Sequence, residues 1–103
     1  MKNNCVEGRS EFNKLNEFSD YLKIIADINR LKILCLLKKG ERCVCNINEP
    51  LGLRQNLTSH HLKALRDAGL VLTRRDGKWV HYRINTEKLN YLNELYNEII
   101  SRQ

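Results

Sequence analysis

The chain of 103 residues is long enough for one compact domain with a small core, since 42% of its residues are hydrophobic. Its formal net charge of +6 and its pI of about 9.3 favour a polyanionic partner such as nucleic acid. No apolar run reaches the ~18 residues that span a membrane, and the start of the chain lacks the apolar centre of a signal peptide. Composition therefore argues against a membrane protein and predicts a cytoplasmic location.

Helical periodicity begins at Glu11. Residues 1–10 are polar and aperiodic, so we expect a flexible tail followed by one domain over residues 11–103. From Phe12 to Ile25, apolar residues recur every three or four positions, which is typical of an amphipathic helix. A second helix is expected over residues 27–38, ended by Lys39 and Gly40. Its predicted inward face consists of Ile28, Leu31, Leu34, Cys35 and Leu37.

Two further helices are expected over residues 44–51 and 55–68, with Gly52 in the turn between them and Gly69 after the second. Two helices joined by a short glycine-containing turn are typical of a helix-turn-helix. Pro50 lies late in the first of this pair, where it removes one hydrogen bond and loosens the helix.

After Gly69 the pattern alternates, and Asp76-Gly77 is a strong signal for a two-residue hairpin turn. That turn places Arg74 opposite Trp79. The predicted inner face of the hairpin consists of Val71, Thr73, Val80, Tyr82 and Ile84. A last helix over about residues 87–101 carries the stripe Leu89, Leu92, Tyr96 and Ile99. The sequence thus predicts a mainly α winged helix-turn-helix of about five helices with a two-stranded β wing.

Positive charge gathers on the expected reading surface. Between Arg54 and Arg83 seven basic residues face two acidic ones, which accounts for five of the six net charges. Such clustering is typical of a nucleic-acid surface. In the helix over residues 55–68, Leu57, His61, Ala64, Leu65 and Ala68 are predicted to point inward, with His61 as a hydrogen-bonded structural residue. The predicted DNA contacts are Arg54, Gln55, Asn56, Thr58, Ser59, His60, Lys63 and Arg66 on this helix, with Arg74, Arg75 and Lys78 on the hairpin.

Within this set, Gln55, Thr58 and Ser59 are the candidates for reading base edges, because the first residues of a recognition helix go deepest into the major groove. Lysine and arginine hold phosphates instead.

Three segments, DINRLKILCLLKKGERCVCNI, LGLRQNLTSHHLKALRDAGLV and RRDGKWVHYRI, resemble the ArsR/SmtB (arsenical-repressor) family of metal-sensing winged-helix repressors. The resemblance covers roughly residues 12–100. It implies a homodimer built from the first and last helices, bound to double-stranded operator DNA. Two recognition helices in successive major grooves require half-sites about 34 Å apart.

Cys43-Val44-Cys45 matches the CVC metal-site core of that family. Side chains two apart share a direction in extended chain and diverge by about 200° in a helix, so two thiolates can bind one ion only where the turn is not fully helical. Thiolates select soft ions such as As(III), Sb(III), Cd(II), Pb(II) and Zn(II). A disulfide across so short a loop would be strained.

A third sulfur ligand is expected from Cys5, since some family members recruit an N-terminal cysteine from the other protomer. Cys35 continues an apolar stripe and is predicted to pack in the core. The family's other common site, formed by Asp and His residues across the last helix, is missing because no histidine follows His81.

The sequence therefore predicts a repressor that binds its operator without ligand and is released by As(III), Sb(III) or a soft divalent metal ion. A thiol-based redox or persulfide sensor of the same fold, using Cys5 and a CVC cysteine, is the first alternative. A protein-binding winged helix with a structural zinc ion is the second. An enzyme is not predicted, because no acid/base pair or activated nucleophile is found. The physiological inducer, the operator and the regulated gene stay open.

Overall fold

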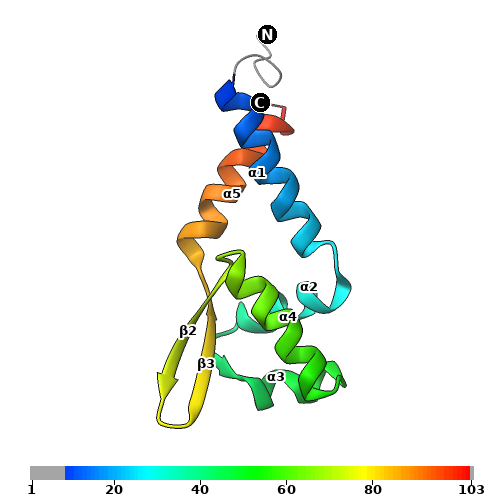
Figure 1. Ribbon diagram of the computed structural model, residues 1–103, viewed down its shortest axis with the longest axis vertical. Helices are drawn as coiled ribbons and strands as arrows, with labels where there is room; N and C mark the ends of the chain where they lie inside the picture. The colour runs from blue at the N-terminus through cyan, green and yellow to red at the C-terminus, as the bar shows by residue number, and fades with distance from the viewer. Residues whose placement is uncertain (1–8, 103) are drawn as a thin grey trace.

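The computed structural model describes residues 9–102, with side chains from Phe12 onward. Helices α1 (Arg9–Ile25) and α5 (Thr86–Ile99) pack against each other and project from a body that holds the remaining elements (Figure 1). The longest dimension is 51 Å. Within the described part, no helix has the length and apolar character needed to cross a membrane. Helix α1 begins two residues before the predicted Glu11 boundary, and the rest of the predicted tail lies outside the described residues.

Helix α2 (Ile28–Leu37) begins at Asp27, whose side chain accepts hydrogen bonds from the backbone N–H groups of Asn29 and Arg30. Its predicted inward face is partly wrong. Leu37 is buried, but the helix also buries Ile33, whereas Ile28, Leu31 and Cys35 are exposed. This helix carries apolar rows on two opposite sides, so periodicity alone could not select the row that faces the core.

The prediction that Cys35 packs in the core is likewise wrong. Cys35 lies four residues after Leu31 and three after Lys32, and both of these side chains are exposed. Side chains three or four residues apart share a helix face, so Cys35 points away from the body with them. Its thiol is free and exposed.

A two-residue strand that the sequence did not reveal, β1 (Arg42–Cys43), precedes α3 (Val44–Leu51). Arg42 also compensates for the proline in α3. Pro50 has no N–H for the carbonyl of Asn46, and the Arg42 guanidinium donates to that carbonyl at 3.2 Å. Strand β1 is therefore tied to the helix that follows it.

Helix α4 (Gln55–Asp67) ends in a Schellman motif. The N–H of Gly69 donates to the carbonyl of Arg66, and the N–H of Leu70 donates to that of Leu65. Gly69 has a φ of 79°, which a residue with a Cβ adopts only at a cost. The buried side chains of Leu65 and Leu70 add the apolar contact of this motif. The predicted end of the helix at Gly69 is confirmed.

The wing consists of β2 (Val71–Asp76) and β3 (Trp79–Ile84), and β1 pairs with the other edge of β3. The predicted register is wrong by two residues, because the loop is Gly77-Lys78 rather than Asp76-Gly77. Asp76 pairs with Trp79, and Arg74 pairs with His81. A shift of two residues leaves every side chain on its face, so the predicted residues still share one side of the hairpin, but Thr73 is exposed there.

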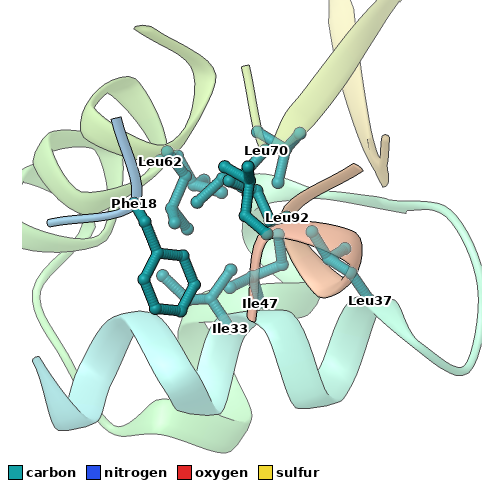
Figure 2. Close-up of a cluster of buried hydrophobic side chains, with 10 residues drawn as sticks. Phe18, Ile33, Leu37, Ile47, Leu62, Leu70 and Leu92 are labelled. Carbon is teal, nitrogen blue, oxygen red and sulfur yellow. The ribbon is translucent and has the colours of Figure 1, made fainter. Parts of the chain in front are cut away.

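One core joins all five helices of the described part of the chain (Figure 2). It brings Phe18 of α1 and Leu92 of α5 against the helix-turn-helix. Asn85 caps α5 by accepting from the N–H of Lys88, and its side-chain amide donates to the carbonyl of Gly69 at 2.9 Å. The buried residues are Phe18, Ile33, Leu37, Ile47, Leu62, Leu65, Leu70, Val71, Leu92 and Leu95.

Replacing Gly69 with alanine should lower the free energy of unfolding by about 1–2 kcal/mol, because a Cβ disfavours the left-handed backbone. The added Cβ would meet only the flexible Lys88 side chain, at 3.8 Å, so backbone strain rather than a clash is responsible. Urea denaturation at fixed protein concentration measures the loss. Gly69→Asn is the matched control and should lose less, since asparagine tolerates this conformation. Equal losses in the two variants would contradict this explanation.

Candidate nucleic-acid interface and thiol site

Helix α4 packs on α2 and α3 through one row of side chains and turns the opposite side to solvent. The buried row consists of Thr58, His61, Leu62 and Leu65. Thr58 is fully buried, so its predicted outward orientation and its place among the base-reading residues are wrong. Leu57, predicted inward, is 45% exposed. The true helix face is rotated from the predicted one, because the small Thr58 fits where a leucine was expected.

The exposed side of α4 still presents most of the predicted contacts. Gln55, Asn56, Ser59, His60, Lys63 and Arg66 are all exposed, and so is Arg54 just before the helix. Lys63 and Arg66 share the carboxylate of Asp67 at 2.8 and 3.8 Å, and the hydrogen bond from Lys63 lowers the pKa of Asp67. The side chains on this face can donate to and accept from base edges and phosphates.

His61 holds α4 against α2, as predicted for a structural histidine. The Arg30 guanidinium donates from Nε to His61 Nδ1 at 3.1 Å and from Nη1 to the carbonyl of Ile24 at 3.2 Å. Asp27 caps the same turn of α2. This network fixes α4 relative to the end of α1.

At the wing, Arg74 is held by a carboxylate that the sequence did not implicate. Its Nη2 lies 2.7 Å from Glu41 Oε1, and its Nε lies 3.3 Å from both carboxylate oxygens. The pair lowers the pKa of Glu41 and raises the pKa of Arg74, because each charge stabilises the other. Near the tip, Lys78 Nζ lies 5.3 Å from the exposed ring of Trp79. Arg74 therefore has to leave Glu41 to contact a phosphate.

The two CVC thiols meet where β1 becomes α3. Cys43 has extended backbone (φ −87°, ψ 165°) and caps the helix, and Cys45 is its second residue. The turn therefore meets the condition that it is not fully helical, and the two Sγ atoms lie 2.9 Å apart. Cys43 is buried and Cys45 exposed. The hydrogen bond between them lowers the pKa of the Cys43 thiol and raises the pKa of the Cys45 thiol.

Among the described residues, these two thiols are the candidate sulfur ligands. Between residues 9 and 102 no group of three or more His, Cys, Asp or Glu side chains is placed to hold a metal ion. Cys5, the predicted third ligand, lies outside the described residues. Cys43 pairs across the sheet with His81, which pairs in turn with Arg74. One row of residues thus runs from the thiols to the wing, and the sequence concealed it because a two-residue strand has no periodicity.

Comparison with known proteins places these features in a family context. Residues 27–73 match the model described as bacterial regulatory protein, arsR family. The chain is 44% identical over 78 residues to the arsenical resistance operon repressor of Staphylococcus xylosus, covering 76% of this chain and 75% of that protein. It is 42% identical over 78 residues to the cadmium resistance regulatory protein CadC of Listeria innocua, covering 75% and 66%.

A solved structure is similar along most of the chain. It is the homodimeric winged helix-turn-helix DNA-binding domain of a possible ArsR-family transcriptional regulator from Mycobacterium bovis. The TM-score is 0.66 at 34% identity, and the match covers 85% of this chain and 79% of that chain.

Replacing Glu41 with glutamine should tighten binding to double-stranded DNA, because it frees Arg74 for a phosphate. The salt dependence of binding should steepen by up to about 0.9 in log–log slope for the added contact. Fluorescence anisotropy across a salt series measures both quantities. Glu94→Gln on α5 removes the same charge far from the wing and serves as the control. If Glu41→Gln still tightens binding when Arg74 is also replaced by glutamine, the released arginine is not the cause.

Proposed function

Because this chain belongs to the ArsR family of bacterial regulatory proteins, we propose that it is a homodimeric repressor released from its operator by a thiophilic metal or metalloid. Membership confirms the predicted resemblance and the winged helix-turn-helix fold. It also bears out DNA binding and a non-enzymatic role, since the family consists of transcriptional regulators. A protein that binds chromosomal DNA works in the bacterial cytoplasm, which is the location we infer.

The main support for the proposed inducer site is the position of the Cys43 and Cys45 thiols. Two thiolates at a strand–helix junction suit a soft ion, and relatives are named for arsenical and cadmium resistance. As(III) or Sb(III) is the favoured inducer, and Cd(II) or Pb(II) fits the same donors. Sulfurs bound tetrahedrally at about 2.3 Å from a metal lie about 3.8 Å apart. The thiols, at 2.9 Å, would have to separate by about an ångström for a tetrahedral ion, and by less for pyramidal As(III).

That separation would act on both halves of the DNA-binding surface. Cys43 is the last residue of β1 and the cap of α3, so moving it disturbs the start of the helix that braces α4. It also disturbs the strand that follows Glu41, the partner of Arg74. A coupling of about 1–3 kcal/mol between ligand and DNA is enough for a sensor. Cys5 is proposed as the third sulfur ligand, contributed by either protomer.

Exposed apolar side chains on α1 and α5 support the proposed homodimer. Phe12, Leu22, Tyr96 and Ile100 are between 42% and 56% exposed, which is costly for a protein this small. Leu92, another residue of the predicted stripe, is instead buried in the protomer's own core. The dimer surface is therefore formed by the outer sides of the two projecting helices.

Replacing Cys43 and Cys45 with serine should leave DNA binding without ligand unchanged and abolish release by arsenite. Serine keeps the shape of the side chain but removes the soft thiolate. In a gel shift with the DNA upstream of the gene, arsenite should weaken wild-type binding by about 5–150-fold, the range of ordinary coupling energies. The double variant should show no change.

Cys35→Ser is the matched control and should respond to arsenite like the wild type, because its thiol is exposed on another helix. Release of the double variant by arsenite would show that the inducer binds elsewhere. Release of the wild type by mild oxidant, with the mass of a Cys5-containing disulfide, would favour the redox alternative.

Replacing Tyr96 with glutamate should produce monomers that bind the operator poorly. The new charge cannot be buried against a second apolar surface without losing its hydration. Sedimentation velocity at micromolar concentration measures the association state. Ile100→Glu, 56% exposed, tests the same surface without touching the core, and Leu72→Glu on the wing is the control. A wild-type monomer, or dimers in both helix variants, would contradict the proposed interface.

A further inference from the structure

Leu57 is an apolar side chain in the first turns of α4 that its own protomer covers only in part. It is 45% exposed, although the next residue and the residues four and five positions along are buried. On the helix surface it lies beside His60 and Ala64, its neighbours three and seven residues on. Asn56 precedes it and is exposed. Leu57 therefore belongs to the rim of the surface that the polar residues of α4 form.

A single exposed leucine is ordinary on most protein surfaces. At Leu57, however, the charged residues nearby indicate which kind of partner covers the side chain. Arg54 lies at the start of α4, and Lys63 and Arg66 lie on its exposed side. An apolar protein surface offers these cations no anionic group beyond Asp67, with which Lys63 and Arg66 already pair, whereas duplex DNA supplies a regular array of phosphates. Charge complementarity therefore selects DNA as the occupant of the surface that includes Leu57.

The major groove offers one apolar group at the base edges. Guanine, adenine and cytosine present hydrogen-bonding groups there, and thymine alone adds a C5-methyl group. We propose that Leu57 reads a thymine in each operator half-site through contact with this methyl group. The assignment rests on the proposed binding of operator DNA, and it names a base-reading residue in place of the buried Thr58.

Uracil interference tests the proposal, because uracil pairs like thymine but lacks the methyl group. The DNA upstream of the gene is amplified with part of its thymine replaced by uracil and then separated by gel shift into bound and free fractions. Cleavage at uracil shows which methyl groups binding requires. Wild type should disfavour uracil at one position in each half-site, by about fourfold for one lost methyl contact.

Leu57→Ala should lose this interference, so it should bind DNA with thymine and DNA with uracil at that position equally well. Leu57→Met should retain it, because methionine keeps an apolar tip. Leu31→Ala, which shortens an equally exposed leucine on α2, is the matched control and should keep the wild-type pattern. Circular dichroism and sedimentation verify that each variant folds and dimerises like the wild type.

Three results would overturn the proposal. One is a wild type without methyl interference, and another is a Leu57→Ala variant with the wild-type pattern. The third is a Leu57→Ala variant that dimerises less well, which would assign the leucine to a protein contact. In all three cases salt-dependent binding of the wild type would keep the proposed function intact. If the wild type failed to bind this DNA in the gel shift, both the thymine contact and the proposed function would be overturned.

Discussion

Two residues of extended chain, Arg42 and Cys43, join the wing to the helix-turn-helix. They pair with Tyr82 and His81 on the wing, and they lead directly into α3. The Arg42 guanidinium also binds the Asn46 carbonyl that Pro50 leaves without a donor. Because strand pairing, a helix start and a thiol share so short a segment, it cannot change at one of them without affecting the others. The position of the wing relative to the helix-turn-helix depends on this segment.

The sequence predicted the elements better than it predicted their faces. Helix ends at Gly52 and Gly69 followed from chemistry that acts within a few residues, since glycine alone adopts a positive φ at no steric cost. The face of α4 depended on tertiary packing, which places the small Thr58 inside and Leu57 outside. The pair of CVC thiols was visible because both cysteines lie within three residues. Glu41 was not, because its partner is 33 positions away.

On the wing, the Glu41 carboxylate and a DNA phosphate would compete for the same arginine, Arg74. Glu41 holds Arg74 with oxygens placed much as those of a phosphate would be, so an exposed carboxylate imitates the ligand that DNA would supply. Both side chains are substantially exposed, and an exposed pair of this kind contributes little to stability. The contact can therefore exchange for a phosphate at small cost. We expect this pair to weaken binding to all DNA alike, which would leave discrimination to α4.

Helix α3 is also held by few interactions, which suits a helix whose position a ligand is to change. It is the shortest helix among the described residues, and it contains a proline, which removes one of its backbone hydrogen bonds. Helix α4, by contrast, ends in a Schellman motif and is fixed to α2 through Arg30 and His61. Local opening occurs where the fewest interactions have to break. A ligand that separated Cys43 from Cys45, as we propose, would therefore act on the weaker helix of the pair, and α4 would lose its support while keeping its own structure.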